Sequence, residues 1–175
     1  LKDSEACLIC NGYKDEEFIE LGLFARKMGI NCFFVVEMPG EIPLIIKKSR
    51  EMGVDPLIGI RIKLSTKAGG QWTESSGDRS VFGLNMIQIM EALDYLKKEK
   101  MIHCLKLLHY HIGSQIPNIR DIRTGVLEAS RIYAGLCLEG APMGYLDLGG
   151  GLAVDYDGSH TNFPSSRNYS TEEYC

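Results

Sequence analysis

Residues 104–151, CLKLLHYHIGSQIPNIRDIRTGVLEASRIYAGLCLEGAPMGYLDLGGG, decide the fold because they contain one complete strand, helix and strand. The segments 104–111 and 144–148 are short apolar runs with few charges, which is typical of strands that are covered on both faces. The segment 119–138 between them has the length and the apolar spacing of a helix. Two strands joined through a helix form the repeating unit of a parallel α/β sheet.

The same alternation extends toward the N-terminus. We predict further strands at residues 7–11, 31–37 and 57–63, and further helices at about 15–28, 41–52 and 86–98. Connections between parallel strands are right-handed, so five such units form either an open doubly wound sheet or an arc of a closed barrel. The pattern alone favours neither. Segments 65–80 and 158–170 are rich in Gly, Ser, Thr and Asn and are predicted loops.

The apolar spacing also predicts which helix residues face the core. These residues are Phe18, Leu21 and Ala25 in the first helix, Ile42, Ile45 and Ile46 in the second, and Ile87, Met90 and Leu96 in the third.

Composition excludes several classes of function. The chain has 175 residues, is 45% hydrophobic and carries a net charge of −4, with its 19 Lys and Arg residues spread along the sequence. No basic patch for nucleic acid, no membrane-spanning run and no signal peptide are recognisable, so we expect a small-molecule partner. Scattered cysteines favour a reducing compartment. The chain begins at Leu1 and stops just after a helix-like start at residues 170–173, so we expect an excerpt of a longer protein.

In parallel α/β folds, ligands bind beyond the carboxyl ends of the strands. The glycines 149–151 follow a predicted strand, where backbone amides without side chains could surround a phosphate. A tight turn is the alternative interpretation. The run lacks the spacing of the motifs that bind nucleoside triphosphates or dinucleotides.

A second candidate site follows the preceding strand. His109 and His111 are two residues apart and therefore share a face, which suits either a metal pair or a ring that stacks on a flat cofactor. Gly113 and Ser114 add a hydroxyl and backbone amides that suit a phosphate. Further potential metal ligands, namely His103, His160, Asp147 and Asp155, lack ligand spacing, so we predict no metal site.

Three segments resemble the biosynthetic arginine decarboxylases: ICNGYKDEE (9–17), LLHYHIGSQIP (107–117) and LDLGGGLAVDYDGS (146–159). HIGSQ and DLGGG are shared with the wider fold-type III, alanine-racemase-like decarboxylases that use pyridoxal 5'-phosphate (PLP), including those acting on ornithine and diaminopimelate. The loop STKAGGQW (65–72) and the segment GLAVDYDGS (151–159) narrow the resemblance to arginine.

The resemblance implies that residues 1–175 form a partial PLP-binding domain, about five of the eight βα units of a (β/α)8 TIM-like barrel, without the rest of the barrel or the C-terminal β domain. It implies that His111 stacks on the cofactor ring and acts in catalysis, while Ser114 and the amides of Gly149, Gly150 and Gly151 hold the phosphate. The implied substrate-contacting segment comprises Leu146, Asp147, Leu148, Gly149, Gly150, Gly151, Leu152, Ala153, Val154, Asp155 and Tyr156.

The implied reaction is decarboxylation of L-arginine to agmatine and carbon dioxide, which starts a route to putrescine and spermidine. The resemblance further implies a homo-oligomer whose subunits share the active site, raises magnesium as an additional cofactor, and places the protein in the cytoplasm, or in a plastid if a transit peptide precedes it. None of Lys2, Lys14 or Lys63 occupies the motif of the lysine that holds PLP, so we expect this excerpt alone to be inactive.

One position departs from the family pattern. Many relatives have Lys before Phe-Gly, where this chain has Val81, so one cationic contact is missing or comes from Arg79. The alternatives that stay open are a decarboxylase of ornithine, lysine or diaminopimelate, a non-catalytic regulatory homologue, and an unrelated hydrolase with a metal on His109 and His111.

Overall fold

The computed structural model describes residues 6–65 and 80–175. Its strands are β1 (Cys7–Cys10), β2 (Asn31–Val36), β3 (Leu57–Ile62), β4 (Leu105–Tyr110) and β5 (Tyr145–Asp147). Its helices are α1 (Glu16–Lys27), α2 (Glu41–Met52), α3 (Met86–Lys98), α4 (Ile119–Leu138) and the short α5 (Thr171–Tyr174), and a 3-10 turn, η2 (Ile102–Cys104), precedes β4. The predicted order of strands and helices is confirmed. The fourth strand begins one residue later than predicted because Cys104 belongs to the 3-10 turn.

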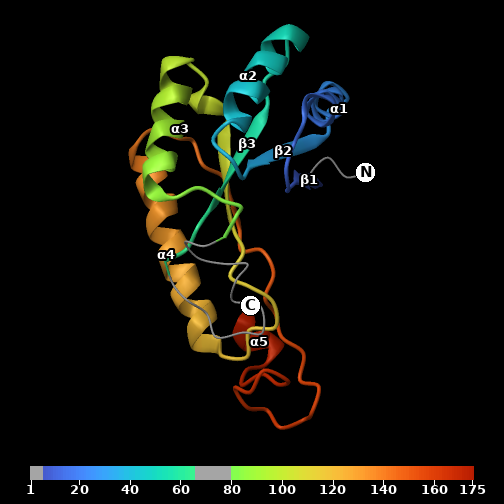
Figure 1. The fold of residues 1–175 in the computed structure, drawn as a ribbon, viewed down its shortest axis with the longest axis vertical. Coiled ribbons are helices and arrows are strands. Elements are labelled where there is room, and N and C mark those ends of the chain that lie inside the picture. The colour runs from blue at the N-terminus through green and yellow to red at the C-terminus, as the bar shows by residue number, and fades with distance from the viewer. Residues whose placement is uncertain (1–5, 66–79) are drawn as a thin grey trace.

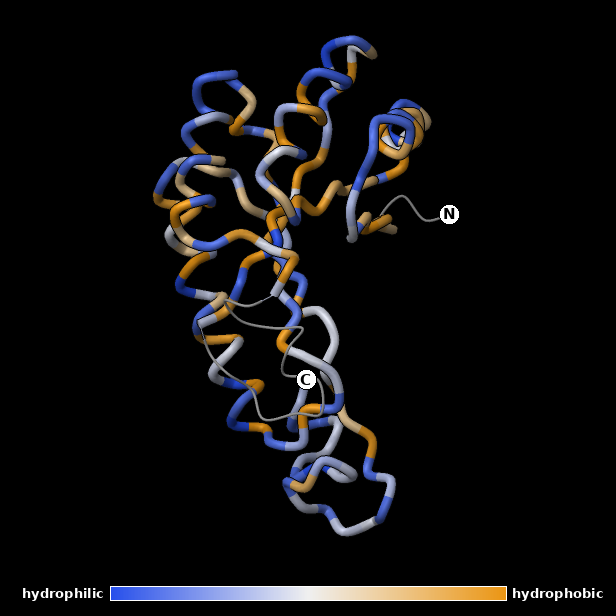
Figure 2. Tube along the Cα trace, in the orientation of Figure 1, coloured by the Kyte–Doolittle hydropathy of each residue, from blue (hydrophilic) through white to orange (hydrophobic). Residues whose placement is uncertain are grey.

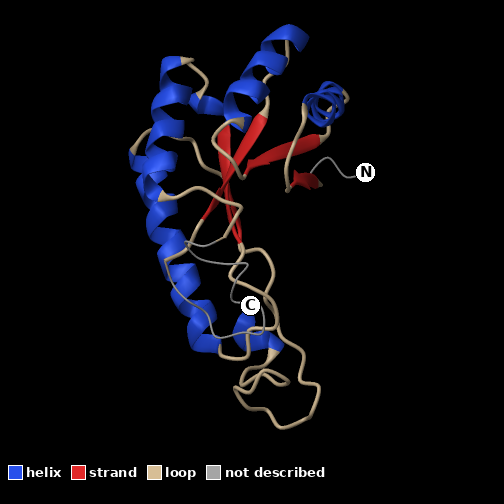
Figure 3. Cartoon of the chain, viewed as in Figure 1, coloured by secondary structure: helices blue, strands red, loops and turns tan. Residues whose placement is uncertain are grey.

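The sheet has the topology of a barrel arc. All four neighbouring pairs are parallel, and the strands lie in sequence order from β1 to β5. The helices α1 to α4 lie on the outer side of the curved sheet, and no described helix covers the inner side (Figures 1 and 3). A doubly wound sheet would have helices on both faces and a break in strand order. The structure therefore resolves the alternative that the pattern left open in favour of a partial barrel.

Alternate strand residues point to the two faces of the sheet. One set, including Phe34, Ile60 and Leu108, packs with the helices into the main hydrophobic core. Figure 2 shows hydrophobic residues concentrated on the strands and on the helix turns beside them. The other set points inward and includes a small apolar cluster of Phe33, Val35 and Leu107. Polar residues follow this cluster toward the carboxyl ends of the strands, where they form the site described below.

The buried face of α1 differs from the prediction. Phe18 and Leu21 were expected to face the core, but their exposed fractions are 40% and 63%. The buried residues of this helix are instead Ile19, Gly22 and Leu23. Gly22 explains the difference, because a Cβ atom there would lie 2.5 Å from the ring of Phe34. The helix approaches the sheet closely at Gly22, with Ile19 and Leu23 beside it in the core, so Phe18 and Leu21 remain on the outer side.

The other helices follow the prediction to different degrees. The buried positions of α2 include Ile42, Ile45 and Ile46, as predicted. In α3 the prediction holds for Leu96 but is wrong for Ile87 and Met90, which are 71% and 42% exposed. The residues Ile89, Ala92 and Leu93 take their place in the core. Among the described helices, none combines the length and the apolar composition needed to cross a membrane.

Candidate cofactor site

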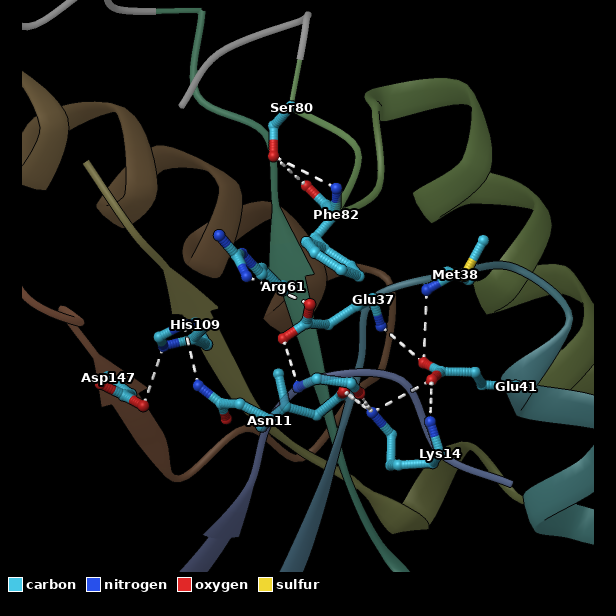
Figure 4. Close-up of polar contacts among 12 residues, drawn as sticks. Asn11, Lys14, Glu37, Met38, Glu41, Arg61, Ser80, Phe82, His109 and Asp147 are labelled. Atoms are coloured by element: carbon cyan, nitrogen blue, oxygen red, sulfur yellow. Dashed lines mark hydrogen bonds and ion pairs between the residues drawn. The ribbon is translucent and has the colours of Figure 1, made fainter. Parts of the chain in front are cut away.

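Five polar side chains form one layer on the inner face of the sheet, at the carboxyl ends of the strands. They are Asn11 after β1, Glu37 after β2, Arg61 in β3, His109 in β4 and Asp147 in β5. The strand register pairs Arg61 with His109 and His109 with Asp147. Figure 4 shows His109 in contact with Asn11 and Asp147, and Arg61 in contact with Glu37. Residues in register on neighbouring parallel strands share a face, so the layer follows from the register.

A cavity of about 440 Å³ opens over this layer. It is lined by Ile9, Asn11, Arg61, His109, His111, Asp147, Gly149 and Gly150. The structure thus brings together four residues that the resemblance had implied as site residues, namely His111, Asp147, Gly149 and Gly150. Ile9 and Arg61 were not anticipated as site residues.

Arg61 is a cation at the wall of the cavity. Its Nη1 donates to Oε2 of Glu37 at 3.1 Å, and its guanidinium carbon lies 5.9 Å from the centre of the Phe82 ring. Glu37 is only 2% exposed, and its Oε1 accepts from the amide of Gly12 at 2.8 Å. Arg61 is the single charged residue of the strand Leu57–Ile62. A charge in an otherwise apolar strand needs a partner, and that signal could have identified Arg61 from the sequence. Val81 occupies the position before Phe-Gly where many relatives have Lys, and its side chain is 76% exposed.

A buried ion pair supports this wall from behind. The side chain of Lys14 is fully buried, and its Nζ lies 3.2 Å from Oε1 of Glu41. The same Nζ donates to the carbonyl oxygens of Gly12 at 2.5 Å and Val35 at 2.6 Å. Glu41 also accepts from the amides of Glu37 at 2.7 Å and Lys14 at 3.1 Å. All three protons of the ammonium group therefore have acceptors.

His109 connects the layer to the glycine run. Its Nε2 lies 3.3 Å from Nδ2 of Asn11. Its Nδ1 lies 2.9 Å from Oδ2 of Asp147, but the angle of this second contact is not that of a hydrogen bond. The amide of Gly149 donates to Oδ1 of Asp147 at 2.9 Å. The contact with His109 is the main cause that lowers the pKa of Asp147, and the amide of Gly149 adds to it. An ionised Asp147 therefore holds both the ring and the first glycine.

His111 lies next to this pair and is half buried. Burial lowers its pKa, and the neighbouring charge of Arg61 lowers it further. The ring is consequently neutral near pH 7, where its ordinary pKa of about 6.5 would leave a fraction protonated. A Cβ atom on Gly150 would lie 3.4 Å from Cε1 of His111, so the glycine run and this ring are in close proximity.

Two glycines are required by the close approach of the turns after β4 and β5. Gly149 has φ +65°, and a Cβ atom there would lie 2.1 Å from the carbonyl oxygen of Tyr110. Gly151 has φ +124°, and its Cβ would lie 2.9 Å from Cγ2 of Ile112. No described residue accepts a hydrogen bond from the amides of Gly150, Gly151 or Ser114. The run is therefore both a tight turn and a set of available donors, which suits an anion such as phosphate.

The two turns are joined by several hydrogen bonds. Gln115 donates through Nε2 to the carbonyl of Val154 at 2.6 Å and accepts from its amide at 2.9 Å. The amide of Ile116 donates to the carbonyl of Gly151 at 3.0 Å. Tyr169 donates its hydroxyl to the carbonyl of Ile116 at 2.8 Å. These bonds fix the position of one turn relative to the other.

The remaining residues of the implied substrate segment have different surroundings. Leu146, Leu152, Val154 and Tyr156 are exposed, Ala153 is buried, and Leu148 packs against the core. Asp155 accepts from the hydroxyl of Ser166 at 2.6 Å and lies 3.1 Å from Nδ1 of His160. Its carboxylate thus stabilises its own loop in this structure, and it does not line the cavity beside His111.

Comparison with known proteins gives consistent matches. The model of the pyridoxal-binding domain of pyridoxal-dependent decarboxylases matches residues 2–174. A biosynthetic arginine decarboxylase of Phocaeicola vulgatus is 51% identical over 173 residues, which cover 98% of this chain and 28% of that protein. The chain therefore spans little more than a quarter of the length of such curated relatives.

Solved structures of decarboxylases also match this chain. The biosynthetic arginine decarboxylase SpeA of Campylobacter jejuni superposes with a TM-score of 0.82 at 33% identity, covering 98% of this chain and 27% of that one. A diaminopimelate decarboxylase of Helicobacter pylori, solved with L-lysine, has a TM-score of 0.74 at 23% identity over 93% of this chain and 39% of that one. Because the sequence identity to the diaminopimelate decarboxylase is only 23%, this match shows a similarity of fold alone.

Proposed function

Because this chain belongs to the pyridoxal-dependent decarboxylases, as part of their pyridoxal-binding domain, we propose that it forms the cofactor-binding half-barrel of an enzyme that converts L-arginine to agmatine and carbon dioxide. The observation that carries the proposal is the juxtaposition of His111 with Gly149 and Gly150 beside one polar cavity. The proposal for arginine rests on relatives named as arginine decarboxylases, at up to 51% identity.

The residues that line the cavity, together with the adjoining turns that contain Gly151 and Ser114, fit PLP. The cofactor is a flat ring with a phosphate, and the available amides of Gly150, Gly151 and Ser114 would hold the phosphate while His111 would lie against the ring. When bound, PLP supplies a conjugated ring that takes up the electron pair left by the departing carboxylate. Since the absence of partners for these amides is the property a phosphate site needs, the donor set supports this cofactor.

The chain's own residues provide orientation and electrostatics. A neutral His111 presents a flat ring without the cost of burying a charge. Asp147 fixes the first glycine amide and the ring of His109. Arg61, in register with His109 on the neighbouring strand, adds a positive charge that Glu37 holds in place. Such groups are positioned before a ligand binds, so little reorganisation is required.

The test uses the full-length protein that contains this chain. Its absorbance should show bound cofactor, and carbon dioxide release should be measured in parallel from arginine, ornithine, lysine and diaminopimelate. Release from arginine alone supports the proposal. Release from another of these amino acids would replace the substrate, bound cofactor without release would favour a regulatory homologue, and absence of bound cofactor would overturn the assignment of the cavity.

Replacing His111 separates stacking from proton chemistry. We expect His111→Ala to weaken cofactor binding about tenfold or more, because it removes a ring contact of about 0.5–1.5 kcal/mol together with its buried area. His111→Phe keeps a flat ring and should retain most of the affinity. Equilibrium dialysis of the cofactor measures both. Equal affinities of the two variants would contradict a stacking role.

Further parts of the proposal concern the whole protein. We propose a homo-oligomer with a shared active site, a place at the start of a polyamine route, and a reducing compartment such as the cytoplasm or a plastid. The thiols of Cys10, Cys32 and Cys104, which are buried and not in disulfides, support the reducing compartment. The magnesium expectation gains no support here, since the described residues contain only one cluster of three potential metal ligands and it includes a thiol.

A further inference from the structure

A second group of reactive side chains lies at the end of the sheet opposite the cavity. Asp55 precedes β3, and His103 and Cys104 belong to η2, which directly precedes β4. Strands β3 and β4 are neighbours and parallel, so their amino ends bring these segments together. The cavity with His109 and Asp147 lies at the carboxyl ends of the same sheet. The two groups are therefore separate sites.

The three side chains already have the separations of metal ligands. Nε2 of His103 lies 3.1 Å from Oδ2 of Asp55 and 3.4 Å from Sγ of Cys104, and all three atoms lie within 4.8 Å of one another. Tetrahedral zinc with bonds of about 2.0–2.3 Å to nitrogen, oxygen and sulfur requires ligand separations of roughly 3.3–3.6 Å. Shifts of about an ångström or less would complete the geometry.

The burial of the three residues suits a site that opens to solvent. Cys104 is 2% exposed, whereas the side chains of His103 and Asp55 are 56% and 70% exposed. The sulfur thus approaches from the core, and the imidazole and carboxylate approach from the surface. A metal ion could enter from solvent and keep water as its fourth ligand. Because His103 and Asp55 are already in contact, little freedom would be lost on binding.

The donor set identifies the class of metal. One thiolate, one imidazole and one carboxylate suit Zn²⁺ and other borderline transition metals, whereas Mg²⁺ and Ca²⁺ prefer oxygen ligands throughout. We propose that Asp55, His103 and Cys104 form a three-ligand site for Zn²⁺, which stabilises the amino end of the sheet and takes no part in the chemistry of the cavity. The linear sequence gave no ligand spacing for this site, because Asp55 is 48 positions from His103.

Calorimetric titration of Zn²⁺ into the full-length protein with its cofactor, after removal of metals with a chelator, tests the proposal. We expect saturable binding at one equivalent per chain and an increase in the melting temperature. His103→Gln should weaken this binding more than about 100-fold, since even outer-shell partners contribute 10–100-fold at metal sites. His103 is exposed, so this variant should fold normally.

Two control variants test whether zinc binding needs the three ligands together, or only an Asp–His pair or a thiol elsewhere in the chain. His160→Gln removes a second Asp–His pair that has no thiol beside it, and Cys137→Ser removes an exposed thiol elsewhere. Both should bind Zn²⁺ as the parent does. Addition of Co²⁺ should give a thiolate-to-cobalt absorption that Cys104→Ser lacks. Absence of saturable binding in the parent, or unchanged binding in His103→Gln, would overturn the proposal.

Discussion

Replacing Lys14 with methionine is expected to destabilise the full-length protein by about 3–5 kcal/mol, the usual cost of leaving one partner of a buried ion pair alone. The carboxylate of Glu41 would lose its counter-charge 3.2 Å away in a position that is 3% exposed. The carbonyls of Gly12 and Val35 would lose donors as well. Thermal or denaturant unfolding monitored by circular dichroism measures the effect.

Lys47→Met is the matched control for this prediction. Lys47 also contacts a carboxylate, at 3.8 Å from Glu16, but its side chain is 58% exposed. Exposed pairs contribute about 0–1 kcal/mol, so we expect almost no change in stability. If the two variants were equally stable, the buried pair would not support the cavity wall as described.

Gly149→Ala is expected to abolish most cofactor binding, with a loss of affinity well beyond tenfold. The backbone at this residue has φ +65°, which costs an L-residue about 1–2 kcal/mol. The new methyl group would also lie 2.1 Å from the carbonyl oxygen of Tyr110, so one of the two turns must move. Since the amides beside Gly149 are the proposed phosphate donors, their displacement should be measurable by equilibrium dialysis of PLP.

Gly158→Ala separates the backbone cost from the collision. Gly158 has φ +71°, but nothing lies within 4 Å of the position of its Cβ. This variant should lose about 1 kcal/mol of stability and keep its cofactor affinity. If Gly149→Ala bound the cofactor as well as Gly158→Ala, the glycine run would be a turn without a binding role.

The strands, the helices and part of the candidate site could be predicted from local sequence. Short apolar runs bounded by Gly and Pro are covered strands in any parallel α/β fold, and ligand sites follow their carboxyl ends. This reasoning predicts His111 and Gly149 as candidate site residues. The same reasoning offered Arg61 only as a charged residue in an apolar strand, because its position beside the cavity depends on the register of β3 with β4.

Other misjudged features depended on packing. The apolar residues of α1 occupy more than one face, so periodicity could not decide which of them is buried. The decision came from Gly22, which allows the helix to approach Phe34. Likewise, the resemblance implied that Asp155 contacts the substrate, and only the positions of Ser166 and His160 indicate that its carboxylate is engaged within its own loop.

The sequence by itself determined the order of the elements and the strand-end motifs, because these depend on residues near one another along the chain. The alternation of strands and helices then implied a parallel sheet, since such strands must be joined by crossover connections. Only the tertiary structure decided that the sheet curves into a barrel arc, that Glu37 supports Arg61, and that Asp55 meets His103. Those contacts join residues from different strands or turns, and their distances are set by strand register and helix packing, which no local pattern specifies.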